Sequence, residues 1–149
     1  MGVGSVTKVF LKSSPEYLPR LRTIVACLAE GVGMDHQEVE DTKLALTEVC
    51  SNAMRYGSPG GIEDTVSVEL TALGNTITAD VTDNGAEADS KAIVSHLDIG
   101  LGMKLIQSLT DTVRFTDRNN GLTVSLTKRA KNASYFESAL EEPVGLRRN

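Results

Sequence analysis

The sequence has no tryptophan, and phenylalanine, tryptophan and tyrosine together make up only 4% of its 149 residues. Proteins that hold single strands of nucleic acid stack the bases on such side chains, so this kind of surface is not expected. Basic residues are also in the minority, since 15 Lys and Arg against 20 Asp and Glu give a net charge of −5. Because general nucleic-acid binding depends on a basic surface that releases counterions, we expect no direct nucleic-acid partner.

Long hydrophobic runs are absent too. No stretch approaches the ~20 apolar residues that a membrane-spanning helix needs, and residues 1–10 lack the charged head and apolar core of a secretory signal. Both cysteines, Cys27 and Cys50, lie among apolar neighbours on predicted helices, which favours buried free thiols over a disulfide. These absences predict a cytoplasmic protein in a reducing compartment, without membrane contact.

The composition that remains is typical of a globular chain. Hydrophobic residues make up 40% and charged residues 23%, and the length suits one domain with its own core. Side-chain periodicity predicts strands at 3–12, 64–73, 76–82, 112–116 and 122–127, and helices at 15–30, 36–56 and 103–109. This order predicts an α+β fold: a two-layer α/β sandwich whose mixed, mostly antiparallel sheet carries helices on one face.

Local signals predict several boundaries within this fold. Ser13-Ser14-Pro15-Glu16 predicts a helix start with a serine cap, and Asp35 with Glu38 predicts a capping box. Gly74-Asn75 predicts the tight turn of a hairpin. We expect the domain to occupy residues 1–128, because residues 129–149 contain few apolar side chains and predict a poorly ordered tail.

Glu48 and Asn52 are the first candidate functional residues. They are four apart on the second predicted helix, so their side chains stack one turn above the other. A neighbouring face carries the apolar stripe of Leu46, Val49, Cys50 and Ala53. An acid and a carboxamide placed in this way can hold an activated hydroxyl or water beside a hard cation. Taken alone, such a pair is more often solvated helix surface.

Two further segments carry candidate ligand-binding residues. Asp83-Asn84-Gly85 follows a strand, where a carboxylate can accept a hydrogen bond from an exocyclic amine and Gly85 lets backbone approach a flat ring. An ordinary Asp-Asn-Gly turn is the alternative. Gly100-Leu101-Gly102 opens the third helix, where amides without helical partners and the helix dipole favour phosphate. The alternative there is a plain glycine entry to a helix.

Together, in this order and spacing, the three segments resemble the GHKL ATPase superfamily, whose fold is also called the Bergerat fold. Within it, the chain is most similar to the stand-alone serine kinases that act as bacterial anti-sigma factors, over about residues 6–128. L-A-L-T-E-V-C-S-N-A-M-R-Y-G resembles the N box, V-T-D-N-G the adenine-reading box and I-G-L-G-M-K-L-I the glycine box. In the last strand, G-L-T-V-S-L-T-K, Thr123 takes the position of a threonine near the adenine-reading aspartate.

The resemblance implies a role for each matched residue. Glu48 would be the general base that takes the proton from a serine or threonine hydroxyl of a substrate protein, and Asn52 would bind Mg²⁺. Asp83 would bind the adenine amine, and the amides around Gly100 would hold the phosphates. The residues expected to bind ATP are Asn52, Asp83, Gly85, Gly100, Leu101, Gly102, Met103 and Thr123.

The resemblance also implies a partner-switching activity. The protein would be an ATP-dependent serine/threonine kinase and anti-sigma factor that binds a sigma factor, phosphorylates an anti-anti-sigma (STAS-type) protein and works as a homodimer. Glu87 replaces the second glycine of the adenine box, and Tyr56 stands where many relatives carry His. A partner switch that binds ATP without turnover is therefore the alternative. The ATP-binding half of a histidine kinase is disfavoured, because a strand begins almost at residue 3.

Two arginines on the first predicted helix fit either of two interpretations. Arg20 and Arg22 are typical of a solvated helix face, and in a partner-binding protein they could instead meet acidic groups.

Overall fold

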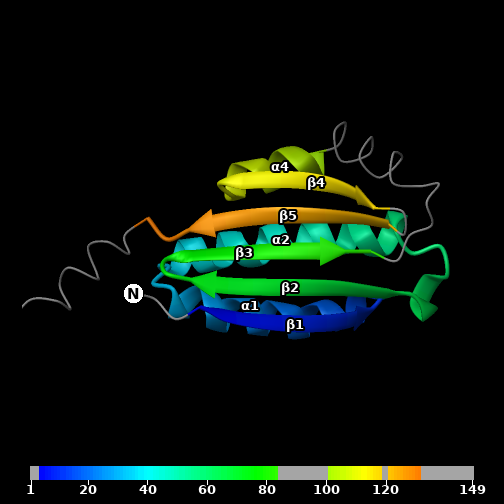
Figure 1. The fold of residues 1–149 in the computed structure, drawn as a ribbon, viewed down its shortest axis with the longest axis horizontal. Coiled ribbons are helices and arrows are strands. Elements are labelled where there is room, and N and C mark those ends of the chain that lie inside the picture. The colour runs from blue at the N-terminus through cyan, green and yellow to red at the C-terminus, as the bar shows by residue number, and fades with distance from the viewer. Residues whose placement is uncertain (1–3, 84–100, 119–120, 132–149) are drawn as a thin grey trace, which may run out of the picture.

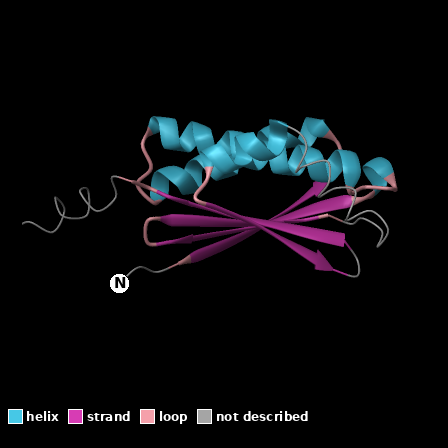
Figure 2. Ribbon diagram, turned by 90° about the horizontal axis from the view of Figure 1, so that it is seen from above, coloured by secondary structure: helices cyan, strands magenta, loops and turns pink. Residues whose placement is uncertain are grey.

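The computed structural model describes residues 4–83, 101–118 and 121–131, which form two layers (Figures 1 and 2). The strands are β1 (Ser5–Lys12), β2 (Thr65–Leu73), β3 (Thr76–Thr82), β4 (Thr112–Arg118) and β5 (Gly121–Arg129). The described helices are α1 (Leu18–Gly31), α2 (His36–Tyr56) and α4 (Leu101–Leu109), with short 3-10 turns at Pro15–Tyr17 and Gly61–Glu63. All three α-helices of the described part lie on one face of the sheet, so the predicted α+β sandwich is confirmed.

The sheet has the strand order β1-β2-β3-β5-β4 (Figure 1). Each pairing among the described strands is antiparallel, so the expected mixed sheet contains no parallel pair in this part of the chain. The β2–β3 hairpin turns at Gly74, whose φ of +62° suits glycine because it has no Cβ. Insertion of β5 between β3 and β4 places Thr123 opposite Thr82, and thereby brings the start of β5 to the end of β3.

The main core lies between the sheet and the helices. From the sheet, alternate residues of each strand face inward, as strand geometry requires, and Leu11, Val68 and Leu122 are among the most buried. From α2, the predicted stripe of Leu46, Val49, Cys50 and Ala53 is buried throughout, which confirms the helical periodicity. None of the helices in the described part has the length and apolar composition that a membrane crossing requires.

The predicted start of the first helix is wrong in its details. The α-helix begins only at Leu18, after a 3-10 turn, and the Ser14 side chain makes no capping hydrogen bond. The hydroxyl of neighbouring Ser13 instead donates to Ser58 Oγ at 2.6 Å, far along the chain. Cys27 is also exposed rather than buried, because it lies away from the face of α1 that packs on the sheet, whereas Cys50 is buried; both are free.

The capping box at the start of α2 is confirmed. Asp35 Oδ1 accepts from the Glu38 amide at 2.8 Å, and Glu38 Oε1 accepts from the Asp35 amide at 2.9 Å. At the other end of the domain, β5 continues through Arg129, and the Ala130 amide donates to the Asn75 carbonyl at 2.8 Å. The sheet layer therefore extends past the predicted boundary at 128, and residues 132–149 of the predicted tail lie outside the described residues.

Candidate functional site

Glu48 and Asn52 face the start of α4. A methyl group at Gly102 would lie 2.9 Å from Glu48 Oε2 and 3.6 Å from Asn52 Nδ2. The backbone that opens α4 is thus in close contact with both polar side chains, and a larger residue at 102 would displace the Glu48 carboxylate. Asn52 is 6% exposed, while Glu48 is partly exposed. The structure therefore brings together the first and third predicted segments, which lie about fifty residues apart in the sequence.

Asp83 is the described residue of the second predicted segment, and it follows the last residue of β3. Its amide donates to the Leu122 carbonyl at 3.1 Å, and its Oδ1 accepts from the Leu122 amide at 3.1 Å. The side chain is 5% exposed. Because Leu122 of β5 takes part in both bonds, β5 sets the direction of this carboxylate.

Two glycines from other elements pack directly against Asp83. A methyl group at Gly121, at the start of β5, would lie 2.6 Å from both the carbonyl oxygen and Oδ1 of Asp83. A methyl group at Gly57, which follows α2, would overlap Asp83 Oδ2. Gly57 ends the N-box match and Gly121 begins the last-strand match, but neither was predicted to contact Asp83. Nothing in the sequence tells which carboxylate such a glycine will meet, because that depends on tertiary packing.

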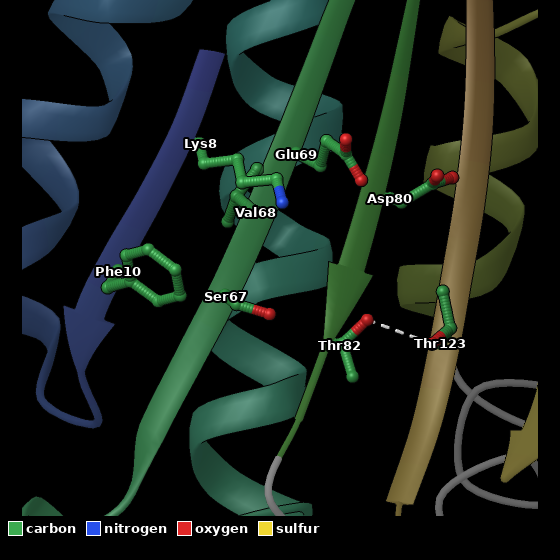
Figure 3. A pocket seen from close by; sticks show the side chains of 8 residues that line it. All are labelled: Lys8, Phe10, Ser67, Val68, Glu69, Asp80, Thr82 and Thr123. Carbon is green, nitrogen blue, oxygen red and sulfur yellow. Dashed lines mark hydrogen bonds between the residues drawn. The ribbon is translucent and has the colours of Figure 1, made fainter. Parts of the chain in front are cut away.

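Thr123 requires a correction. Its side chain lies on the sheet face away from the helices, where its Oγ1 is 2.8 Å from Thr82 Oγ1 (Figure 3). Successive strand residues point to opposite faces, so Leu122, and not Thr123, shares the helix-covered face with Asp83. Thr123 is therefore linked to Asp83 only through the backbone of Leu122.

The other predicted ligand residues are only partly visible. Gly85 and Gly100 lie outside the described residues, and for Leu101, the first residue of α4, only the backbone is described. Met103 is buried and its side chain packs in the main core. A phosphate at this helix start would therefore contact the Met103 backbone amide and not its side chain.

The charged and polar groups of the site suit a nucleotide-bound metal better than a metal enclosed by protein. Among the described residues, no group of three or more His, Cys, Asp or Glu could hold a metal ion. Mg²⁺ characteristically keeps several waters and takes one or two protein oxygens together with substrate phosphates. Asn52, with its carboxamide beside Glu48 and the glycine start of α4, would supply such an oxygen. When bound, the ion neutralises charge on the phosphates.

Between these two polar residues, Cys50 turns to the opposite side of α2. Burial raises the pKa of its thiol to about 12, because a thiolate would have to be held in apolar surroundings. Cys50 is therefore a core side chain and not a nucleophile of the site.

Comparison with known proteins shows the family of this chain and several similar proteins. The Histidine kinase-like ATPase domain matches residues 11–128, so the chain belongs to this family of ATP-binding domains. It is 29% identical over 133 residues to the serine-protein kinase RsbW of Bacillus pumilus, covering 79% of this chain and 82% of the relative. It is 26% identical over 142 residues to RsbW of Listeria monocytogenes, covering 87% of this chain and 90% of the relative.

Two solved structures share the fold. The RsbU and RsbW domains of Rv1364c from Mycobacterium tuberculosis superpose with a TM-score of 0.64 at 20% identity. That match covers 84% of this chain, which spans only 32% of the other. A histidine kinase domain from Erythrobacter litoralis EL346 superposes with a TM-score of 0.52 at 13% identity, covering 83% of this chain and 64% of the other. At these identities the similarity establishes the fold alone.

Proposed function

We propose that the protein is a Mg-ATP-dependent serine/threonine kinase that acts as an anti-sigma factor and phosphorylates an anti-anti-sigma protein of the STAS type. The observation that carries the proposal is the close approach of Gly102 to Glu48 and Asn52. It sets an acid and a carboxamide against a glycine helix start, where phosphates are favoured. The relatives that are serine-protein kinases support the reaction class.

Each group then has a defined task in phosphoryl transfer. Asp83, oriented by the Leu122 amide, would accept a hydrogen bond from the adenine amine. Asn52 would hold Mg²⁺, and the first amides of α4 would hold the phosphates. Glu48 would take the proton from the attacking hydroxyl as that oxygen bonds to the γ-phosphorus and ADP leaves. A well-placed base contributes roughly 10²–10⁴ in rate, so most of the remaining acceleration comes from positioning and charge neutralisation.

The test is transfer of phosphate to a defined protein. Purified chain is incubated with γ-labelled ATP, Mg²⁺ and the STAS-type protein encoded nearest to its gene. We expect label on a serine or threonine of that protein, and a loss of roughly 10²–10⁴ in rate for Glu48→Gln with ATP affinity retained. Absence of transfer by the native protein to any STAS-type protein encoded nearby would count against the kinase.

A second candidate is a partner switch that binds ATP without turning it over. It is favoured by Glu87, outside the described residues, which puts a negative charge where the resembled family has a glycine. The Glu48→Gln variant separates the two functions. Under this second function the variant regulates its partner as the native protein does, whereas the kinase loses that regulation.

A homodimer is part of the proposal. The sheet face opposite the helices has no covering element among the described residues (Figure 2). On it, Phe10 is 69% exposed at the rim of a shallow pocket that also contains Lys8, Glu69 and Asp80 (Figure 3). An exposed aromatic ring among charged groups suits a protein contact. Sedimentation equilibrium should give twice the 15.9 kDa mass of the chain, and a monomer at micromolar concentration would contradict this.

A further inference from the structure

Two serine hydroxyls from distant parts of the chain meet at the end of α2. Ser13 follows β1 and Ser58 lies just after α2, and the Ser13 hydroxyl donates to Ser58 Oγ at 2.6 Å, across 45 positions of sequence. Both side chains are partly buried. Because β1 and β3 are both antiparallel to β2, they end at the same edge of the sheet, where α2 also ends (Figure 1). We call these two residues the Ser13–Ser58 pair.

The Ser13–Ser58 pair caps α2. The last four carbonyls of an α-helix have no partner within the helix. Here the Ser58 hydroxyl donates to the Ala53 carbonyl at 3.3 Å, and Ser13 Oγ lies 3.3 Å from the Met54 carbonyl oxygen. Many helices end instead on a left-handed glycine, but Gly57 has a φ of −109°. Side-chain hydroxyls therefore satisfy the end of α2 in place of that backbone cap.

Ser13 also fixes the loop that leaves α2. Its amide donates to the Asp64 carbonyl at 3.0 Å, at the far end of this loop. Within the loop, the Gly61 amide donates to the Ser58 carbonyl at 3.0 Å. Both ends of the loop are thus bonded to one residue at the end of β1, by its hydroxyl on one side and its amide on the other.

Gly57 connects this cap to the nucleotide site. It immediately precedes Ser58, its amide donates to the Ala53 carbonyl at 2.9 Å, and a methyl group on it would overlap Asp83 Oδ2. Its φ lies outside the left-handed region that favours glycine, so the backbone conformation alone does not require glycine here. The contact with Asp83 does require it. A displacement of the end of α2 would therefore change the surroundings of that carboxylate.

We propose that Ser13 and Ser58 are positioning residues for nucleotide recognition. By capping α2 they hold Gly57 against Asp83, and so keep the carboxylate in the direction that meets the adenine amine. This inference rests on the proposed binding of adenine by Asp83. When only a fraction of the molecules hold a binding group in its competent direction, the apparent affinity falls by that fraction. Loss of the cap lowers this fraction, although neither serine contacts the nucleotide.

The first test removes one hydroxyl at a time and measures Mg-ATP affinity by isothermal calorimetry. Ser13→Ala and Ser58→Ala should each weaken binding about fivefold, the factor that corresponds to one lost hydrogen bond. Thr23→Ala is the matched control, because Thr23 Oγ1 donates only to the Pro19 carbonyl within the exposed part of α1. Native affinity in both serine variants would overturn the inference.

The second test distinguishes positioning of Asp83 from a general effect on the fold. In an Asp83→Asn background, Ser58→Ala should weaken Mg-ATP binding by less than about twofold, because two changes that act through one group do not add. Inorganic triphosphate with Mg²⁺ lacks adenine, so its affinity, measured by competition with ATP, should be the same in Ser58→Ala as in the native protein. A fivefold loss for triphosphate as well would show a purely structural role and contradict the inference.

Ser13→Ala is the milder of the two variants, since it leaves the bond from Ser58 to the Ala53 carbonyl in place. Circular dichroism at the temperature of the binding measurements shows whether each variant is folded. Should Ser58→Ala fail to fold, Ser13→Ala takes its place in both tests with the same expected results.

The outcomes separate this inference from the function on which it rests. Both tests measure binding, so absence of phosphate transfer to a STAS-type protein would count against the kinase alone. Unchanged ATP affinity in Asp83→Asn would contradict the proposed role of Asp83, and the inference with it. Weakened binding in Asp83→Asn, together with native affinity in both serine variants, would refute the inference and leave the role of Asp83 intact.

Discussion

Asp83 has little freedom to turn. Its Oδ1 accepts from the Leu122 amide, and the close approach of Gly57 and Gly121 leaves no room for another side chain beside it. A carboxylate that is fixed before its ligand arrives loses little conformational freedom on binding. If Asp83 binds adenine, as proposed, the two glycines would support this binding by holding the carboxylate in place.

Gly57→Ala should lower ATP affinity by about tenfold, because displacing a packed group costs roughly 1–3 kcal/mol and the displaced group here is the Asp83 carboxylate. Isothermal calorimetry measures the change. Gly31→Ala is the matched control, since nothing lies within 4 Å of a methyl group at that position. Native affinity in Gly57→Ala would show that the position of Asp83 does not limit binding.

The two thiols should differ in reactivity. Burial raises the pKa of Cys50 to about 12, so at pH 8 it is protonated and inaccessible, whereas Cys27 is exposed. Because the thiolate is the reactive form, a thiol reagent at pH 8 should modify one cysteine per native chain and both in denaturant. Mass spectrometry would assign the native adduct, and modification of Cys50 at the rate of Cys27 would contradict the packing.

At the scale of elements, α2 is tied to the far end of the sheet by one buried carboxylate. Glu38 is 6% exposed, and its Oε1 completes the capping box with the Asp35 amide. Its Oε2 accepts from the Lys131 amide at 2.8 Å, across 93 positions of sequence. One side chain therefore satisfies two backbone donors and joins the first turn of α2 to the end of β5.

Glu38→Gln should destabilise the domain by about 1–3 kcal/mol, because one carboxylate oxygen becomes an amide nitrogen, which donates and cannot accept, and a backbone N–H is left unsatisfied. Urea unfolding measures this free energy. The matched control is Glu40→Gln, which removes only a surface ion pair with Lys43 and should cost about 0.5 kcal/mol or less. Equal losses for the two variants would show that the bond to Lys131 contributes nothing.

Sequence patterns predicted the elements whose signals are local. The Asp35–Glu38 box and the Gly74 turn are settled by residues a few positions apart, and both are present in the structure. Ser14 failed as a cap in a segment where Ser13 bonds to the distant Ser58. The bond from Lys131 to Glu38 could not be predicted, since no local pattern joins residues so far apart.

The functional site shows the same difference between local signals, which the sequence predicts, and distant contacts, which it does not. The motifs predicted roles for Glu48 and Asp83, which stay predictions, and the start of α4 lies against Glu48. The side of the sheet on which Thr123 lies depends on the register of β3 with β5, and a shift of one residue reverses it. The packing of Gly57 on Asp83 depends on how α2 crosses the sheet, which no spacing of residues encodes.

At the scale of the molecule, the proposed nucleotide site would join residues of three elements. Asn52 belongs to α2, Gly102 to α4, and Asp83 to the end of β3. A ligand that bridges them binds the folded chain and not the unfolded one, so it stabilises the whole domain.

ATP with Mg²⁺ at 100 times its dissociation constant should stabilise the protein by about 2.7 kcal/mol and raise the thermal midpoint by roughly 5–10 °C. Differential scanning fluorimetry measures the shift. Chelation of Mg²⁺ by EDTA, or Asn52→Ala, should reduce it. GTP should give a smaller shift, since guanine presents an oxygen where adenine presents the amine that Asp83 would bind. Equal shifts with ATP and GTP would contradict the role of Asp83.

The hydrogen bond from the Lys131 amide to Glu38 also fixes one end of α2. From Glu38 to Glu48, α2 forms an arm of about 15 Å, so a rotation of about 5° around the anchored end would swing Glu48 through roughly 1.3 Å. A misplacement of about 1 Å can slow a reaction roughly 10²-fold. If Glu48 is the general base, as proposed, its position would depend in part on the bond at the other end of α2, between the Lys131 amide and Glu38.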